Sequence, residues 1–306
     1  MVKVSAIVVT HNRVKELSRA IESVCGQTYA DIELIVVNDG SDDGTKDYLD
    51  RLEADGVCQA INLDTSGGAA RARNLGVAAS MGELVAFLDD DDVWHRTKIA
   101  EQVPLFAASA NIGAVYCAMR MVFDGAKYVA TKPNEKYRGF IGNDIFTTML
   151  ATSSAMMYTR AAFDAVGGFD ENLTHWQDVE LNIRVGESYA VDFVPRPLVD
   201  VFASTASSAR LSNQYDAWLK AVAYIRYKHA DEIRRLTPQQ KTKFDRMCAE
   251  DELTRLYNSS QRAMWWRKSL SYFTRHPTPG RLLQLVTVHD QLWLWKPLLP
   301  SYSRPA

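Results

Sequence analysis

The chain has 306 residues and a formal net charge of −2, and 47% of its residues are hydrophobic and 24% charged. This length suggests one large domain or two modest ones, which can bury most of their apolar surface without disulfide bonds. The near-neutral charge gives no general electrostatic reason to expect a nucleic-acid partner.

The first hundred residues alternate between predicted strands and predicted helices. Continuous apolar, β-branched runs predict buried strands at 4–9, 32–37 and 84–88, and a further strand is expected near 58–63. Helical spacing and turn residues predict helices after Arg13, over 45–52 and over 69–79. Such alternation implies right-handed crossovers and a mostly parallel sheet.

Polar clusters follow each of these predicted strands. They occupy residues 10–13, 39–43, 67–73 and 89–92. In parallel sheets, ligands gather at the carboxyl ends of the strands. We therefore expect the four clusters to build one site.

The rest of the chain has weaker patterns. Residues 110–200 are expected to mix short strands with loops, including a strand over 155–158 and a helix over 177–185. Beyond about Ser204, apolar residues follow helical spacing and prolines punctuate the runs. This pattern predicts a C-terminal helical region.

The run Asp89-Asp90-Asp91-Asp92 is the most informative feature. Four adjacent carboxylates at the end of a buried strand repel one another, and partial burial would raise their pKa values. A divalent cation relieves this repulsion, and oxygen ligands suit Mg²⁺ or Mn²⁺. Because Mg²⁺ usually completes its shell with substrate phosphates and water, the run predicts a metal–diphosphate site. A solvated acidic turn is the alternative.

Two neighbouring clusters could bind the rest of a nucleotide. Asp39 could accept hydrogen bonds from a base or ribose, or it could hold its own loop as an Asx-turn. Gly67 and Gly68 would let the backbone approach a ligand closely, and Arg71 or Arg73 could pair with phosphate. A helix start with surface arginines is the alternative for that segment.

The segment from Trp176 to Glu180 contains a candidate base, Asp178. An Asp at the start of a helix usually just caps it. Beside an aromatic side chain it could instead deprotonate a sugar hydroxyl, with Trp176 offering an apolar face to the acceptor ring. We expect the helix N-terminus to keep this carboxylate ionised at neutral pH.

Several other catalytic motifs are absent from the sequence. No GxGxxG follows the first predicted strand, which counts against a Rossmann dehydrogenase. The sequence also has no GxxxxGK[ST] phosphate loop, no nucleophile elbow and no HExxH.

Together these segments resemble the family 2 glycosyltransferases, inverting enzymes with the GT-A fold. The matching segments follow the family's order and are 4–13, 36–45, 68–76, 87–94, and 167–170 followed by 177–181. The resemblance implies an α/β GT-A catalytic domain over 1–204, Rossmann-like, with a mostly parallel sheet flanked by helices. Its nucleotide-sugar half would be about 1–110 and its acceptor half about 111–204. Residues 205–306 would form the C-terminal helical region.

The resemblance also implies residue roles on the donor side. The donor nucleotide would contact Thr10, His11, Asn12, Arg13, Asp39, Gly68, Arg73, Asp89 and Asp90. With Trp94 as the anchor, the family's Leu-Asp-x-Asp-Asp-x-Trp pattern selects Asp89, Asp91 and Asp92 for the metal, and Asp91 is the expected main ligand.

On the acceptor side, Asp178 matches the family's catalytic base. Many members have Glu-Asp where this chain has Gln177-Asp178, a departure that could change what holds the acceptor. Trp176 and Gln177 are the predicted acceptor contacts.

The implied reaction is a single displacement. Asp178 takes the proton of an acceptor hydroxyl, and that oxygen attacks the anomeric carbon opposite the leaving diphosphate, whose charge Mn²⁺ or Mg²⁺ stabilises. An α-linked donor would give a β-linked product. The resemblance implies transfer of a hexose (glucose, galactose or N-acetylhexosamine) from a UDP-sugar to a sugar or lipid-diphosphate-linked saccharide, in O-antigen, capsule or other cell-surface polysaccharide synthesis.

The sequence also suggests a location. The N-terminus lacks a signal-peptide pattern, and no window approaches the roughly 18 apolar residues of a membrane span, so we expect a cytoplasmic protein. The four cysteines form no CxxC pair, which fits buried thiols in a reducing compartment. Aromatic residues beside cations at 265–268, near Arg281 and at 293–296 are typical of interfacial helices. They predict peripheral contact with the cytoplasmic face of the inner membrane, unless these tryptophans pack on the catalytic domain.

Two other classes of protein compete with this interpretation. A sugar nucleotidyltransferase shares the α/β layout and the metal, but such enzymes tend to carry a Gly-rich loop with Arg and Lys where this chain has 10–13. A non-catalytic nucleotide-sugar binding module is the other alternative, and the acidic run and Asp178 argue against it.

Overall fold

The first half of the chain alternates strand and helix as predicted. We describe a computed structural model covering residues 1–123, 127–203, 214–259 and 261–275. The first-half elements are β1 (Val4–Thr10), α1 (Val14–Cys25), β2 (Ile32–Asn38), α2 (Thr45–Ala54), β3 (Gln59–Asn62), α3 (Ala69–Ala79), β4 (Leu84–Asp89), β5 (Val93–Trp94) and α4 (Lys98–Phe106).

The second half contains longer strands than the sequence predicts. Its elements are β6 (Ile112–Phe123), β7 (Lys127–Ala130), η1 (Glu135–Tyr137), η2 (Gly142–Thr147), η3 (Ser153–Ala155), β8 (Met156–Thr159), α5 (Arg160–Ala165), α6 (Gln177–Ser188) and β9 (Ala190–Ala203). β6 and β9 pair in parallel, but the register jumps from Cys117 opposite Val194 to Ala118 opposite Pro197. Proline lacks a backbone N–H and is confined to strand edges and bulges, so it hid this long strand from the sequence pattern.

All the strands belong to one sheet, ordered β3-β2-β1-β4-β8-β6-β9-β5, with β7 paired to β6. β1 runs parallel to β2 and β4, and β2 runs parallel to β3. β8 is antiparallel to both of its neighbours. The register sets Thr10 beside Asn38 and Val9 beside Asp89, so three strands end at one edge of the sheet.

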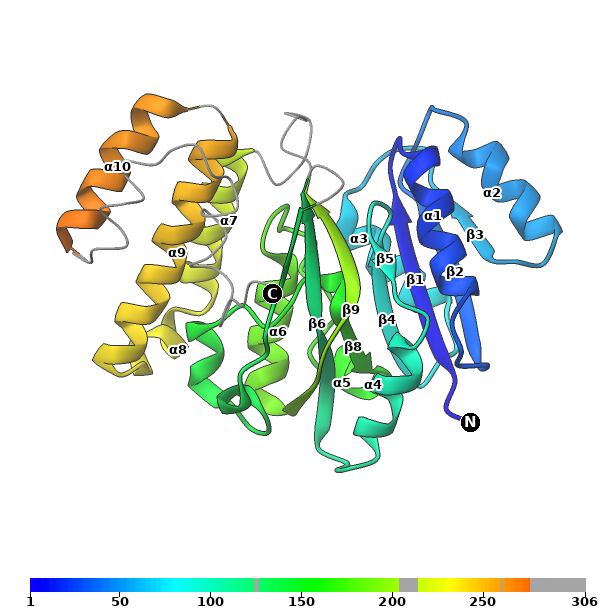
Figure 1. The fold of residues 1–306 in the computed structure, drawn as a ribbon, viewed down its shortest axis with the longest axis horizontal. Helices are drawn as coiled ribbons and strands as arrows, with labels where there is room; N and C mark the ends of the chain where they lie inside the picture. The colour runs from blue at the N-terminus through cyan, green and yellow to red at the C-terminus, as the bar shows by residue number, and fades with distance from the viewer. Residues whose placement is uncertain (124–126, 204–213, 260, 276–306) are drawn as a thin grey trace.

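The C-terminal region is helical, as predicted, over the described residues. It comprises α7 (Tyr215–Lys228), α8 (Ala230–Arg235), α9 (Pro238–Asn258) and α10 (Arg262–Arg275), which gather at the end of the molecule away from β1–β3 (Figure 1). A capping box at Thr237 and Gln240 starts α9, with Pro238 in its first turn. In the part of the chain that the structure describes, no helix is both long and apolar enough to span a bilayer.

The C-terminal helices share the core of the sheet. One cluster of buried apolar residues runs from the strands to Trp218, Phe244, Leu256 and Trp265. Phe244 of α9 packs edge-to-face on Phe146 of η2, with 5.8 Å between the ring centroids. The helices therefore pack against η2, in the part of the chain that follows β4.

Candidate active site

The polar clusters that follow β1 and β4 meet at the edge of the sheet. The Thr10 hydroxyl donates to the Asp90 carboxylate over 2.8 Å, and Arg13 Nη1 lies 3.1 Å from Asp90 and 3.0 Å from Asp91. Arg73 Nη2, from α3, lies 2.6 Å from an Asp89 oxygen. The convergence predicted from the sequence is therefore present for residues 10–13, 73 and 89–91.

The four carboxylates of the acidic run point to different partners. Asp89 and Asp91 keep side chains that are 36% and 18% exposed, whereas Asp90 and Asp92 are buried. Burial is the main cause that raises the pKa of Asp90 to about 6, against the opposing effect of Arg13. Burial, with the charges of Asp91 and Asp89, also raises the pKa of Asp92 well above its ordinary value.

Asp92 does not face the edge of the sheet with the others. It accepts a 2.6 Å hydrogen bond from the Ser154 hydroxyl, and its other oxygen faces the backbone N–H of Phe202 at 3.3 Å. Trp94, the anchor of the predicted motif, donates its indole N–H to the Ser154 carbonyl at 2.8 Å. In this arrangement Asp92 ties β5 to the second half of the sheet, contrary to its predicted role as a metal ligand.

The remaining carboxylates of this run, Asp89 and Asp91, are the candidates for holding a divalent cation. Among the described residues, no three His, Cys, Asp or Glu side chains form a ready-made metal site. Asp89 and Asp91 would be the ligands, with other positions left for phosphate oxygens and water, as Mg²⁺ commonly has in nucleotide sites. The raised pKa of Asp90 reflects burial among neighbouring carboxylates, a situation that a bound cation relieves.

Asp39 is buried and holds the loop before α3. Its carboxylate accepts hydrogen bonds from Ser66 Oγ at 2.6 Å and from the backbone N–H groups of Gly67 and Gly68 at 2.7 and 2.9 Å. A carboxylate has about four acceptor sites, so three are occupied. Asp39 therefore holds a loop, as in the alternative to nucleotide binding. The loop that it holds is the one after β3 and not its own.

The loops after β2 and β3 are also in steric contact at Gly40. This residue has φ +70°, and a Cβ on it would lie 2.5 Å from the backbone nitrogen of Ser66. Gly68, which precedes α3, has φ +90°. Glycine is required at Gly40 by both its conformation and the close approach of the second loop.

The loop after β1 is held in a strained conformation. Asn12 has φ +55°, and its side-chain oxygen accepts from the backbone N–H of Asp42 at 2.8 Å. His11 Nδ1 lies 2.7 Å from the Asp39 carbonyl. Asn12 and Trp176 are the two non-glycine residues with positive φ in the described ranges. Backbone strain of this kind clusters at functional sites, and the other such residue precedes the candidate base.

Asp178 lies in the first turn of α6 and is partly buried. Burial raises its pKa, while a 2.8 Å hydrogen bond from the Val179 N–H and the charge of Arg73 lower it. The net shift is upward. Loss of hydration therefore outweighs the Val179 hydrogen bond and the charge of Arg73. Ionisation of this carboxylate at neutral pH stays a prediction.

The two residues before Asp178 have structural partners. The side chain of Gln177 accepts from Arg73 Nη1 at 2.7 Å and donates to the Leu173 carbonyl at 2.7 Å. Trp176 is 5% exposed, and its indole N–H donates to Asp251 of α9 at 2.8 Å. Trp176 therefore offers no free aromatic face to an acceptor, which corrects the expected platform role.

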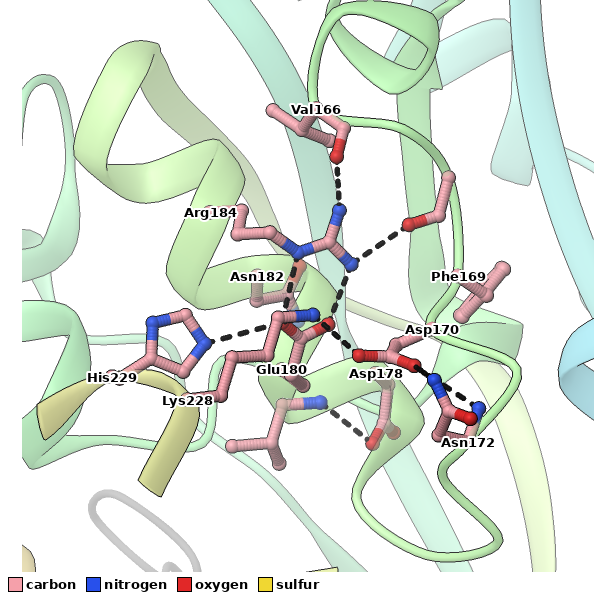
Figure 2. Close-up of polar contacts among 12 residues, drawn as sticks. Val166, Phe169, Asp170, Asn172, Asp178, Glu180, Asn182, Arg184, Lys228 and His229 are labelled. Atoms are coloured by element: carbon pink, nitrogen blue, oxygen red, sulfur yellow. Dashed lines mark hydrogen bonds and ion pairs between the residues drawn. The ribbon is translucent and has the colours of Figure 1, made fainter. Parts of the chain in front are cut away.

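A second charged cluster, which the sequence reasoning missed, surrounds Glu180 (Figure 2). This carboxylate is fully buried and contacts Arg184 at 2.5 Å, Lys228 Nζ at 2.8 Å and His229 Nε2 at 3.1 Å. Burial opposes the shift, but hydrogen bonds from His229 and Arg184 lower the pKa of Glu180 to about 2. The i,i+4 spacing of Glu180 and Arg184 was a local signal for part of it. No local sequence signal indicated that Lys228 and His229 belong to this cluster.

The curled sheet, the edge where its parallel strands end and the acidic run after β4 define a GT-A-type α/β protein. A solved structure of this fold is the mannosyltransferase PcManGT from Pyrobaculum calidifontis in complex with GDP-Man and Mn²⁺. The two share 17% identity with a TM-score of 0.62, covering 97% of this chain and 84% of the other. The chain belongs to glycosyl transferase family 2, whose sequence model matches residues 5–167, a little over half of its length.

Two relatives show where the similarity lies. An uncharacterized glycosyltransferase of Nostoc sp. is 39% identical over 115 residues, or 37% of this chain and 36% of the relative. The Escherichia coli UDP-Glc:alpha-D-GlcNAc-diphosphoundecaprenol beta-1,3-glucosyltransferase WfaP is 37% identical over 100 residues, or 33% of this chain and 39% of the relative. The similarity thus covers less than half the length of either relative.

Proposed function

We propose that this family 2 chain is an inverting glycosyltransferase that moves a hexose from a UDP-sugar to an acceptor hydroxyl with formation of a β-linkage. One observation carries the proposal. Arg73 contacts both Asp89, in the acidic run, and Gln177, which adjoins Asp178. The candidate metal–diphosphate edge and the candidate base therefore border the same guanidinium group.

The donor would lie along the edge where β1, β2 and β4 end. The loop from Thr10 to Arg13 and the interlocked loops at Asp39 and Gly68 would contact the nucleotide, with Asp39 acting mainly through the loop that it orders. Arg73, Asp89 and Asp90 would lie near the diphosphate and sugar. WfaP, which by its name uses UDP-Glc, supports glucose as the first sugar to test, and PcManGT makes GDP-mannose the main competing donor.

Mn²⁺ or Mg²⁺ at Asp91 and Asp89 would stabilise negative charge on the leaving diphosphate. Asp178 accepts the proton of the acceptor hydroxyl, and that oxygen displaces the diphosphate from the anomeric carbon on the opposite face. Arg73 supplies a fixed positive charge beside both groups. The raised pKa of Asp178 makes it a stronger base than an exposed aspartate.

The acceptor would be a sugar or a lipid-diphosphate-linked saccharide, such as the substrate in WfaP's name, in cell-surface polysaccharide synthesis. Because Trp176 is buried, its platform role passes to other residues. A cleft of about 860 Å³ opens beside the loop that leads to Asp178, with Asn172, Thr174, Lys220 and Tyr224 among its lining residues. Amide, hydroxyl and aromatic groups of this kind suit a saccharide.

We also propose that the C-terminal helices touch the membrane peripherally, which would place the protein at the cytoplasmic face. On α10, Trp266 and Leu270 are 46% and 59% exposed and lie one helical turn apart. Trp265 is buried against Tyr257 and Trp266, so only one of the adjacent tryptophans is available for lipid. Arg281 and residues 293–296 lie outside the described residues.

The same reasoning supports a functional division of the chain. Residues 1–204 would form the catalytic unit, with donor contacts before about 110 and acceptor contacts from 111 to 204. Residues 205–306 would add membrane or acceptor contacts. The boundary itself falls at residues 204–213, outside the described ranges.

The test is a donor panel of UDP-, GDP- and dTDP-sugars with Mn²⁺ or Mg²⁺, with and without lipid-diphosphate saccharide acceptors, read as release of nucleoside diphosphate. Asp178→Asn should lower kcat by about 10²–10⁴-fold, because a positioned general base contributes that much. The wild-type rate should fall as the pH drops through the raised pKa of Asp178, since protonation removes the base.

Asp164→Asn is the matched control, because Asp164 lies on α5 outside the site and should leave kcat unchanged. Release of pyrophosphate from a nucleoside triphosphate would favour the nucleotidyltransferase alternative. Nucleotide binding without turnover for any donor and acceptor would favour the non-catalytic binding module. An Asp178→Asn variant as active as wild type would contradict the assigned base.

A further inference from the structure

The loop that delivers Asp178 to the site is unusual in its conformation. It runs from the turn at Asp170 to Trp176, which has φ +56° and immediately precedes α6. A bulky residue in the left-handed region is a genuine outlier and needs surrounding contacts to persist. Because Asp178 is only two residues further on, whatever holds Trp176 also sets where the base points.

The contacts that hold Trp176 come from the C-terminal helices. Its indole N–H donates to Asp251 of α9 at 2.8 Å, and its ring packs edge-to-face on Trp218 of α7 with 6.0 Å between centroids. Trp218 in turn stacks on Tyr215. The indole is thus fixed by a hydrogen bond to a buried carboxylate and by packing against a buried ring.

A second contact from α7 ties the two ends of the same loop together. Lys228 Nζ forms ion pairs with Asp170, at the start of the loop, and with Glu180, in the first turns of α6 (Figure 2). Without the ammonium group, these two carboxylates would repel each other across the base of the loop. Lys228 therefore acts as a cross-link between the residues that flank the loop.

The first end of the loop is also fixed on the donor side. Asn74 of α3 exchanges hydrogen bonds with the backbone N–H and carbonyl of Phe169, both at 2.9 Å. Arg184 donates to the Gly168 carbonyl at 2.7 Å and contacts the Val166 carbonyl. These hydrogen bonds hold the turn before Asp170 in place. Lys228 and Asp251 then fix the position of the base relative to this turn.

We propose that α7 and α9 position the catalytic base, with Lys228 and Asp251 as positioning residues that act on Asp178 through Glu180 and Trp176. This rests on the proposed role of Asp178 as the base. The C-terminal helices are then part of the catalytic machinery, in addition to any contact with acceptor or membrane. A displacement of about 1 Å at a reacting group can cost about 100-fold in rate, so such positioning has a measurable effect.

The first experiment compares Lys228→Met with Arg226→Met. Both residues are cations on α7, but Arg226 pairs with Asp245 of α9 and packs over Phe244, away from the loop. Lys228→Met should lower kcat at least tenfold while KM for the donor changes less than twofold, because Arg73 and the acidic run are untouched. Arg226→Met should leave both constants within twofold. Lys228→Arg, which retains the positive charge, should recover most of the lost kcat.

A second pair of variants tests the other anchor. Asp251→Leu removes the acceptor for the Trp176 indole, whereas Asp251→Asn retains a carbonyl oxygen in the same place. We expect a tenfold loss of kcat for the leucine variant and less than threefold for the asparagine variant. If Lys228→Met fails to fold, this pair decides the question.

Hydrogen exchange provides a measurement that does not depend on turnover. Amides of residues 172–179 should exchange at least tenfold faster in Lys228→Met and Asp251→Leu than in wild type, and at the wild-type rate in Arg226→Met. If no donor and acceptor support turnover, the proposed function fails while this exchange result still decides the positioning. The positioning is overturned if folded Lys228→Met and Asp251→Leu keep wild-type exchange and kcat, or if their loss lies wholly in KM for the donor.

Discussion

Two buried carboxylates in this molecule have opposite electrostatic environments. Asp92, at the end of the acidic run, has a pKa raised well above the ordinary value by burial and by Asp91 and Asp89. Glu180, on α6, has a pKa lowered to about 2 despite burial, because His229, Arg184 and Lys228 donate to it. Burial is similar in both cases, so the neighbouring charges decide whether the pKa rises or falls.

The difference separates a site that can accept a ligand from one that is already complete. In the acidic run, which pairs with Arg13 and Arg73, burial and the neighbouring carboxylates raise the pKa values of Asp90 and Asp92. The cluster around Glu180 and Asp170 holds Arg184 and Lys228, with His229 beside them. Carboxylates that raise one another's pKa values favour a bound cation, whereas a carboxylate surrounded by cations stabilises the position of a helix.

The largest expected effect comes from breaking the cluster around Glu180. Glu180→Gln should lower the free energy of unfolding by about 3 kcal/mol at pH 7, because it removes the buried charge that Arg184, Lys228 and His229 share. A lowered pKa contributes stability that is present above about pH 4.3, the usual glutamate value, and is lost as the pH falls through about 2. Urea denaturation at several pH values should therefore show the two proteins converging in acid.

Asp245→Asn provides the control for this prediction. It removes a surface ion pair with Arg226, whose side chains are 63% and 40% exposed, and such pairs contribute about 0–1 kcal/mol. An equal loss of stability in both variants would mean that the buried cluster contributes no more to stability than the surface ion pair does.

The next effect tests whether the acidic run binds a cation. Asp91→Asn should lower metal-dependent turnover about 100-fold. The reason is that a cation at this site would stabilise the charge that develops in the transition state by several kcal/mol. The variant should also need more Mn²⁺ for half-maximal nucleoside diphosphate release. Wild-type turnover that survives complete chelation of divalent cations would contradict the metal site.

A smaller effect is expected one residue further along. Asp92→Asn should change turnover less than threefold and the free energy of unfolding by no more than about 1 kcal/mol, because an amide can keep one of the contacts with Ser154 or Phe202. Assays of Asp91→Asn and Asp92→Asn in parallel would distinguish a carboxylate that binds the metal from one that only supports the fold. Equal losses in both variants would restore Asp92 to its predicted role.

The smallest effect should follow removal of Arg13, one of the two arginines that pair with the acidic run. Arg13 contacts both Asp90 and Asp91 and would compete with a metal for them. Arg13→Met should therefore tighten Mn²⁺ binding a few-fold, as measured by paramagnetic resonance without substrate. Weaker binding in the variant would show that Arg13 assists the metal site instead.

The sequence predicted the fold of about the first hundred residues well because the signals there are local. Buried β-branched runs marked β1, β2 and β4, and the turn residues after them converge because parallel strands end together. The sequence did not predict in which direction each carboxylate of the acidic run points. Asp92 turns inward because of Ser154 and Phe202, which are 62 and 110 residues away.

Residues 111–203 were harder to predict because distant parts of the chain decide their arrangement. A tryptophan before a helix can be a sugar platform or part of the core, and the choice is made by Asp251 and Trp218 on distant helices. The partner of Gln177 is Arg73, 104 residues earlier. Likewise, nothing near Asp178 in the sequence indicates that burial outweighs the Val179 hydrogen bond and the charge of Arg73 and so raises its pKa.

The interlocked loops after β2 and β3 limit how this protein could be redesigned. Asp39 is hydrogen-bonded to three successive residues of the second loop, and Gly40 leaves no room for a Cβ against Ser66. An insertion in either loop alone would separate the carboxylate from its three donors. Grafting a different sequence at either position would therefore require both loops to be replaced together.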